Sequence, residues 1–341
     1  MRDKYCEPIG KFSVQEKERR WRLSSAMQKS FRRREQEWLE LYLSGLLALD
    51  PAYAWSRFAT VVMEDASTAI SGFRETYAAF LWLSTAKHRR REFGVTNDDL
   101  IRFARFFHDF GRCRAACDTI YSIHNEPAWS DLKNRVAGGD LAEFQAMDAP
   151  LATKLALAAA GGHDRQTLLA GLLSAAHPID RWIAMKGLTM HEGSMAVVYP
   201  AIVAEDDSEF EIDEAFPPSV RIGDYPGYAF DIHVRDGIAA LRCFLKMSDV
   251  PFVSQFLDLL RGDRQKAVSV LGDLLFWAEI GLLSRRRAAS TPSYGYRASQ
   301  RCLYVCTRRA NIPDKAVPDL IQLLREAIPA LNDARLRLVK P

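Results

Sequence analysis

The sequence predicts a mainly α-helical protein, and three observations carry this prediction. Apolar residues recur three and four positions apart through most of the chain, the spacing that places them on one face of a helix. Capping and helix-starting residues, such as Asp50-Pro51 and Asn97, separate the successive stripes. The 341 residues are 48% hydrophobic and 26% charged, as in a globular protein with a substantial core. We therefore expect an array of antiparallel helices with short connections.

The chain divides into four parts by composition. Residues 1–126 are expected to form a helical domain, and residues 127–199 a helical middle region rich in alanine and leucine. Residues 200–234 are acidic and rich in proline, and we expect an irregular connection there, with short strands at most. Residues 235–341 are expected to form a C-terminal domain.

The first domain is predicted from three apolar stripes and a capped helix. The first stripe consists of Leu39, Tyr42, Leu43, Leu46 and Leu47. Asp50-Pro51 ends that helix and starts the next, because aspartate caps a helix and proline suits its first turn. The second stripe runs from Trp55 to Val62 and the third from Phe73 to Leu83. Asn97-Asp98-Asp99 then caps a helix whose apolar face is expected to include Leu100, Phe103, Phe106 and Phe107.

The C-terminal domain is predicted to contain both helices and a strand. Helix resumes at Arg235, a new helix starts at Pro251, and a third ends at Gly281. Residues 294–309 alternate aromatic, apolar and polar side chains, which predicts a strand. This order of helix, basic loop and strand resembles that of small winged-helix α+β modules. A final amphipathic helix is expected from about Val317 to Ile328.

Basic clusters suggest contact with nucleic acid. The net charge is only +3, so any affinity for a polyanion has to come from clustered rather than overall charge. Aromatic residues lie close to the clusters, and a surface of cations and aromatics suits single-stranded or distorted nucleic acid. The candidate nucleic-acid-binding residues are Lys29, Arg32, Arg33, Arg34, Lys87, Arg89, Arg90, Arg91, Arg285, Arg286 and Arg287.

No sequence motif points firmly to an enzyme. Neither G-x-x-x-x-G-K-[ST] nor G-x-G-x-x-G occurs, so we expect no P-loop ATPase activity and no nucleotide cofactor. The cysteine pairs Cys113/Cys117 and Cys302/Cys306 are interpreted as buried, reduced thiols rather than a metal centre. No signal peptide or membrane-spanning run is recognised, so a cytoplasmic location is expected.

Two alternatives for a catalytic site stay open. His108-Asp109 resembles the central pair of HD-domain phosphohydrolases, in which a His-Asp pair binds a divalent metal that activates water. That chemistry needs a further His and Asp, and His88 and Asp118 are the nearby candidates. Separately, Asp231, His233 and Arg235 would share one face if residues 227–237 were extended, as a phosphate contact or an acid/base pair requires.

One stretch, residues 24–67, resembles a known family. Its matching residues are Ser25-Ala26, Lys29-Ser30, Arg32-Arg33, Asp50-Pro51, Tyr53, Arg57 and Glu64-Asp65. The stretch is similar to the C-terminal helical region of the replication-associated recombination protein A (MgsA/RarA) family of clamp-loader-like ATPases. The resemblance implies a helical collar that self-associates and works beside replication or repair DNA. The ATPase domain that precedes this region in the family is absent from these residues, so ATP hydrolysis is not carried over.

These observations together predict a non-enzymatic accessory protein of DNA replication or repair. Its expected partners are DNA and either further copies of itself or an ATPase subunit, without a membrane. We expect at least two of Arg32, Arg33 and Arg34 to be available to a phosphate backbone, because consecutive residues fan around a helix. We also expect the stripe from Leu39 to Leu47, with Trp55, to offer apolar surface for assembly. The alternatives are a protein-interaction module that binds through the acidic connection, and an HD-like metal-dependent phosphohydrolase.

Overall fold

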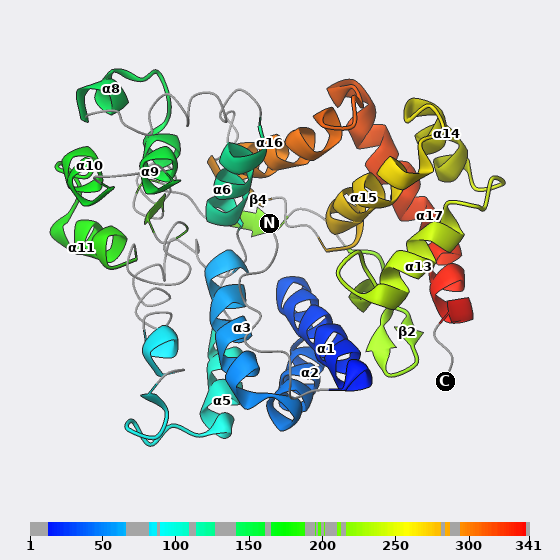
Figure 1. The fold of residues 1–341 in the computed structure, drawn as a ribbon, viewed down its shortest axis with the longest axis horizontal. Helices are drawn as coiled ribbons and strands as arrows, with labels where there is room; N and C mark the ends of the chain where they lie inside the picture. Colours follow the sequence, from blue (N-terminus) through cyan, green and yellow to red (C-terminus); the bar gives the residue numbers. More distant parts are fainter. Residues whose placement is uncertain are drawn as a thin grey trace.

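The computed structural model confirms the mainly α-helical class in the part of the chain that it describes (Figure 1). The described residues are 13–65, 82–86, 89–108, 114–126, 141–160, 165–187, 195, 197–198, 201, 210–212, 216–280, 284–286 and 294–338. The α-helices are α1 (Val14–Arg33), α2 (Gln36–Leu49), α3 (Pro51–Asp65), α5 (Asn97–His108), α6 (Ala115–Asn125), α8 (Leu141–Ala146), α9 (Leu151–Ala160), α10 (Arg165–Leu172), α11 (Pro178–Gly187), α13 (Arg235–Phe244), α14 (Pro251–Leu259), α15 (Arg264–Leu275), α16 (Tyr294–Arg308) and α17 (Val317–Leu338).

Short elements complete the described chain. The 3₁₀ turns are η3 (Gly227–Ala229) and η5 (Asp314–Ala316), and a π-helical turn, η4 (Phe276–Ile280), extends α15. The strands β1 (Phe210–Ile212) and β4 (Ser284–Arg286) pair antiparallel, as do β2 (Arg221–Ile222) and β3 (Tyr225–Pro226). The expected irregular connection is therefore made of short strands and turns where it is described.

Two hydrophobic clusters organise the molecule. The first runs from Leu23 to Val234 and is formed mostly by helices α1 to α11. The second runs from Leu241 to Ala334 and is formed by α13 to α17. Figure 1 shows the helices of the second cluster gathered on one side, with α6 and α16 packed together where the two sides meet. Tyr121 of α6 packs against the second cluster and so links the two.

Helix α1 is specified locally at both ends and packs closely against α2. Ser13 and Glu16 form a reciprocal capping box at its start. Arg34 takes the left-handed conformation, with φ of 58°, and ends it. The approach to α2 is close, because a Cβ on Gly45 would lie 3.0 Å from the Leu23 side chain. Two helices that approach so closely hold the side chains of α1 in fixed positions.

Local chemistry set several helix boundaries as predicted. Helix α3 begins at Pro51, and the Asp50 carboxylate accepts a hydrogen bond from the Tyr53 amide at 3.1 Å. Helices α5, α13 and α14 begin at Asn97, Arg235 and Pro251, the positions expected from the sequence. Most of the third predicted stripe, residues 73–83, lies outside the described residues.

The predicted strand at residues 294–309 is wrong, since these residues form α16. The buried side chains Cys302, Leu303, Val305 and Cys306 follow the period of a helix, not the alternation of a strand. They lie against α6, a contact distant in sequence. The described basic residues Arg285 and Arg286 lie in β4 instead, so the strand on which the winged-helix comparison depended is absent from its predicted position.

The predicted assembly surface is also wrong for the residues named. Leu39, Leu43, Leu46 and Trp55 are completely buried, and Leu47 is 5% exposed. They pack within the first cluster because α1, α3 and α5 lie against α2. None of the described helices is long and apolar enough to cross a membrane.

We predict that Gly237→Ala destabilises the fold by about 3 kcal/mol, because the added Cβ forces an overpacked contact. A Cβ at this position would lie 1.9 Å from the backbone oxygen of Asp231, and backbone cannot move aside as a side-chain tip can. Chemical denaturation measures the loss. The neighbouring Ala239→Gly is the control and should cost about 1 kcal/mol of helix propensity. Equal losses in the two variants would contradict the close approach.

Candidate functional site

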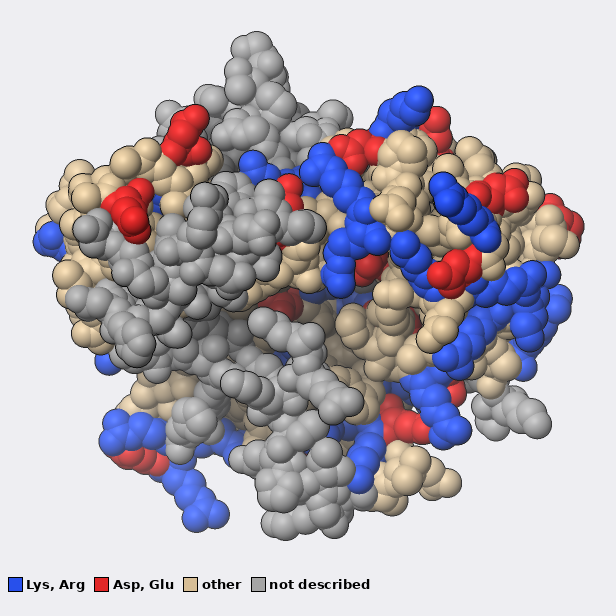
Figure 2. Space-filling view, turned by 45° about the horizontal axis from the view of Figure 1, so that its top comes forward, with Lys and Arg blue, Asp and Glu red and all other residues tan. Residues whose placement is uncertain are grey.

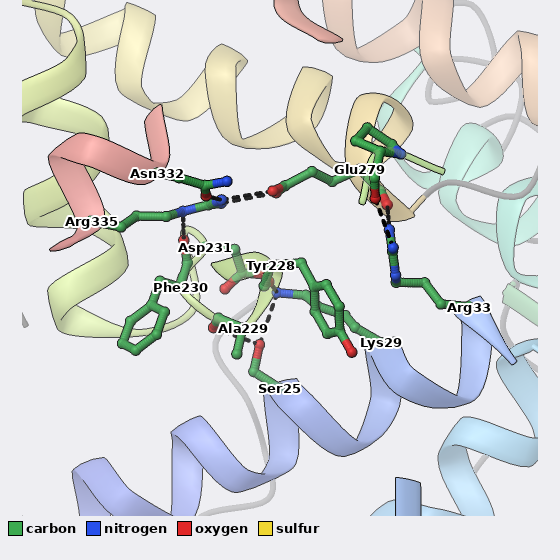
Figure 3. Close-up of polar contacts among 11 residues, drawn as sticks. Ser25, Lys29, Arg33, Tyr228, Ala229, Phe230, Asp231, Glu279, Asn332 and Arg335 are labelled. Atoms are coloured by element: carbon green, nitrogen blue, oxygen red, sulfur yellow. Dashed lines mark hydrogen bonds and ion pairs between the residues drawn. The ribbon is translucent and has the colours of Figure 1, made fainter. Parts of the chain in front are cut away.

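The face of α1 that carries the predicted basic cluster points into the protein. Figure 3 shows Ser25 and Lys29 of α1 directed at the turn formed by residues 228–231. The Lys29 ammonium donates to the Tyr228 carbonyl at 2.6 Å and to the Ser25 hydroxyl at 2.8 Å. It also pairs with the Asp231 carboxylate at 2.5 Å. We call these contacts, with those of Arg33 and Arg335 below, the polar junction.

Burial sets the ionisation of the Lys29–Asp231 pair. Lys29 is 3% exposed and Asp231 9%. Burial lowers the pKa of the Lys29 ammonium, while the nearby Asp231 carboxylate acts to raise it. Burial alone would raise the pKa of Asp231, but attraction to Lys29 and a hydrogen bond from the His233 amide bring it below the ordinary value. The two groups thus form a buried ion pair, which is costly to break by removing one partner.

Arg33 and Arg335 complete the polar junction from opposite sides (Figure 3). Arg33 donates to the backbone carbonyls of Glu279 at 2.7 Å and Pro217 at 2.8 Å. Arg335 of α17 is completely buried and forms a bidentate pair with the Glu279 carboxylate, at 2.6 and 2.8 Å. It also donates to the Phe230 carbonyl. Helices α1 and α17 are thereby joined through η4 and the 228–231 turn.

The open alternative of an Asp231/His233 pair on an extended segment is wrong. Residues 230–234 form turns, and the Asp231 carboxylate accepts from the His233 backbone amide at 2.8 Å. The Asp231 side chain turns inward to Lys29, whereas His233 is exposed. A carboxylate held by a buried ammonium is a poor general base, because that ammonium stabilises its ionised form.

A second network, formed around Asp65, joins α1, α3 and α6. Asp65 is completely buried and accepts from Arg32 at 2.8 Å and from Arg114 at 2.6 Å. Burial would raise the pKa of this carboxyl group, but the two guanidinium groups lower it below its ordinary value. The same guanidinium groups lie 4.9 and 4.7 Å from the centre of the Phe276 ring, which brings η4 into the network.

The residues that carry the family resemblance build this interior. Gln28 of α1 donates to Glu64 at 2.6 Å and accepts from Arg57 of α3. The Tyr53 hydroxyl donates to Ser24 of α1, and Arg20 pairs with Asp50 at 2.9 Å. The resembling motif thus serves here to hold α1 against α3 and the 228–231 turn.

The expectation that at least two of the three consecutive arginines face a phosphate is wrong. The side chains of Arg32 and Arg33 are each 6% exposed and occupied by protein partners, and only Arg34 is exposed. The reason is that α3 and η4 lie against α1 and supply a carboxylate and a backbone carbonyl to its cations.

The other predicted basic residues have varied placements. Arg89 and Arg91 are exposed, and Arg89 pairs with Glu92 at 2.7 Å. Arg90 is half-buried, with its guanidinium 6.0 Å from the centre of the Trp55 ring. Arg285 lies opposite Glu211 in the β1–β4 register, so the acidic connection and a basic cluster are neighbours in one sheet. Lys87 and Arg287, and the side chains of Arg285 and Arg286, lie outside the described residues.

The described residues do not support the HD-like metal site. Asp109, His88 and the side chain of His108 lie outside the described residues. Asp118 is 1% exposed and lies 3.5 Å from the Arg114 guanidinium, which competes with any metal for its carboxylate. Within the described chain, no group of three or more His, Cys, Asp or Glu side chains could hold a metal ion. Cys302 and Cys306 are buried free thiols, as expected.

A cavity of about 920 Å³ lies beside the two networks. Helices α1, α3 and α6 line one side, and the 228–233 turn, α15, η4 and α16 line the other. Most of its charged side chains belong to the ion pairs described above. Asp273 of α15 differs, because it makes no hydrogen bond or ion pair with any residue in the described ranges. Burial raises its pKa to about 6, opposed by the charge of Arg309.

The sequence analysis did not identify Arg114, Glu279 and Arg335. Arg114 donates to Asp65, and Arg335 pairs with Glu279. A signal existed for Arg335, since it lies on the apolar face of α17 beside the buried Leu331 and Ala334. A cation at such a position needs a buried acid. The sequence could not show that this acid is Glu279, which lies 56 positions away.

Comparisons with protein-family models, curated proteins and solved structures returned no match to this chain.

We predict that Asp65→Asn costs about 3–5 kcal/mol of folding stability, because two buried guanidinium groups lose their shared counter-charge. Urea denaturation at neutral pH measures this loss. Glu92→Gln, which breaks the exposed pair with Arg89, is the matched control and should cost at most about 1 kcal/mol. Because the folded-state pKa of Asp65 is lowered, its contribution is present above the unfolded pKa and disappears as the pH falls through the folded value. A cost no larger than the control's would contradict the network.

Asp273→Asn should instead stabilise the protein at pH 8, by about 2 kcal/mol. The folded-state pKa of Asp273 is raised to about 6, so ionisation opposes folding at higher pH and the penalty vanishes below the unfolded value near 4. Thermal unfolding at pH 8 and pH 4 should therefore show a gain only at pH 8. Asp258→Asn, at an exposed position of α14, should change stability little at either pH. A loss at pH 8 would show that Asp273 has a stabilising partner.

Proposed function

We propose that the protein is a non-enzymatic helical scaffold that binds nucleic acid through exposed cations of its C-terminal helices. The observation that carries the proposal is a set of exposed lysines and arginines that make no ion pair with any described residue. They are Arg242, Lys246, Arg261, Arg264, Lys315 and Arg337. Figure 2 shows Lys and Arg gathered over the side of the molecule where α13 to α17 lie, interleaved with fewer acids.

These cations differ physically from those of α1. Lys29, Arg32 and Arg33 already have carboxylate or carbonyl partners, so contact with a phosphate would require breaking the fold. The exposed cations are hydrated and surrounded by counter-ions, and phosphate contact would release those ions. Arg261 and Arg264 flank the start of α15, where the helix amides add partial positive charge. The proposed nucleic-acid surface is therefore the C-terminal one, and Arg34, Arg89 and Arg91 remain exposed candidates from the predicted set.

The proposed link to replication or repair comes from the resemblance of residues 24–67 to clamp-loader-like collars. The networks support a scaffold role for that region, since its matching residues hold helices together. We propose on the same basis that the protein self-associates or binds an ATPase subunit. Light scattering on the protein alone and with such a subunit tests this, and a monomer under both conditions would contradict it.

A second candidate function, protein interaction without nucleic acid, is favoured by α11. Ile179 and Trp182 are 46% and 55% exposed and lie three positions apart, so they share one helix face. Exposed large apolar side chains at neighbouring positions are typical of partner-binding surfaces. This candidate becomes the better one if the following experiment finds no nucleic-acid binding.

We predict that Arg261→Glu combined with Arg264→Glu weakens DNA binding at least about tenfold. The logarithm of the binding constant should also fall less steeply as the logarithm of the salt concentration rises. Fluorescence anisotropy with single-stranded and duplex DNA, at about 50 and about 200 mM salt, measures both effects. Stability should change little, because both side chains are exposed.

The matched control is Arg102→Glu combined with Arg105→Glu, which makes the same charge change on exposed positions of α5. Equal loss in both double variants would show that overall charge, not the C-terminal surface, governs binding. Absence of DNA binding by the unmodified protein at low salt would overturn the proposal.

A further inference from the structure

The cavity between the two halves of the molecule has an unbalanced charge. On its lining, Lys29 pairs with Asp231, Arg20 pairs with Asp50, and Arg32 and Arg114 share Asp65 just behind the surface. These four cations are therefore neutralised by acids of the fold, and the remaining described lining cation, Arg57, donates to the Gln28 side chain. The carboxylate of Asp273 is left over among the described lining residues, because no residue in the described ranges donates a hydrogen bond to it or forms an ion pair with it.

The surroundings of Asp273 make the ionised carboxylate unfavourable for folding stability. It lies on α15 between Gly272, where a Cβ would come within 2.9 Å of Ile232, and the buried Leu274. Tyr121 and the buried thiols Cys302 and Cys306 line the same cavity. The charge of Arg309 acts on it, but Arg309 forms no ion pair with it and donates to Asn125 instead. A partly buried charge without a partner opposes folding, whereas asparagine or leucine would not.

We propose that the cavity binds a small organic cation, whose ammonium or guanidinium group pairs with Asp273. The ligand would supply the ion-pair partner that no described residue gives this carboxylate. A volume of about 920 Å³ is ample for a ligand of many non-hydrogen atoms. Trp21, 36% exposed, and Tyr53 line the cavity in edge-to-face contact at 6.4 Å and offer aromatic surface to the rest of the ligand.

Other ligand classes fit this lining less well. An anion would be repelled by the Asp273 carboxylate, and the lining cations Arg20, Lys29 and Arg32 already have acidic partners. A further lining cation, Arg57, donates to the Gln28 side chain. A metal ion needs several oxygen or sulfur ligands together, and the described residues contain no such group. A neutral ligand would desolvate the carboxylate further without neutralising it. An organic cation needs a single carboxylate and tolerates the aromatic walls.

The test uses the full-length protein with spermidine and agmatine as probes, which separate an ammonium from a guanidinium preference. Isothermal titration calorimetry at pH 8, in DNA-free buffer, measures affinity and stoichiometry. We expect saturable binding of at least one probe with one site per chain, and affinity at least about tenfold weaker in Asp273→Asn. We also expect weaker binding at pH 5, where Asp273 is mostly protonated.

Two controls keep the result specific to the cavity. Asp258→Asn removes an exposed carboxylate from α14, so it reports non-specific attraction of the probes to surface acids. Circular dichroism of Asp273→Asn checks that the variant is folded, as its predicted gain in stability implies. Binding that is equal in the unmodified protein and Asp273→Asn, or absent for both probes, would overturn the inference. Neither outcome depends on the nucleic-acid proposal, because no DNA is present.

Discussion

The buried ion pair between Lys29 and Asp231 is the interaction on which the arrangement of the two halves depends. Lys29 enters the interior on α1, which belongs to the first hydrophobic cluster, and Asp231 lies in the turn that leads to the second. An ammonium buried to this degree cannot remain charged without a carboxylate, so α1 and the turn have to stay together. Gly237 makes this geometry sterically accessible, because any larger residue would collide with the Asp231 backbone. The apolar clusters supply cohesion within each half, and the ion pair specifies how the halves meet.

The Asp65 network applies the same constraint to the helices of the first half. Asp65 at the end of α3 faces two guanidinium groups, one from α1 and one from the start of α6. A guanidinium group donates hydrogen bonds only in its own plane. These contacts therefore restrict the rotation of the helices more tightly than apolar packing does. Phe276 then lies against both guanidinium groups and ties η4 to the network. The cavity lies beside these contacts because helices held at fixed distances by polar side chains cannot collapse onto one another.

The sequence predicts the structural features that neighbouring residues determine, and it does not predict those that depend on residues remote in sequence. The starts of α3, α5 and α14 are decided by one or two neighbouring residues, and Asp50-Pro51, Asn97 and Pro251 were sufficient to place them. The burial of Arg33 is decided by carbonyls at positions 217 and 279, which no local pattern reveals. Residues 294–309 were predicted as a strand from the alternation of their side chains, but they form α16 and pack against α6, a partner that is also remote in sequence. Asp273 carried no local signal, because its significance comes from having no hydrogen-bond or ion-pair partner among the residues that the structure describes.

Charged residues in this protein therefore differ in what they imply about function. Buried, paired charges such as Arg32 and Arg335 are explained by the fold, and their basic character says little about a ligand. Exposed cations such as Arg261 and Arg264 are solvated at little cost, so they permit nucleic-acid binding without requiring it. Asp273 is not paired with any described residue and is not fully solvated, so its ionisation opposes folding. A residue that weakens the fold where a neutral isostere would not is explained most simply by a bound partner, so this carboxylate is a stronger indication of function than the more numerous arginines.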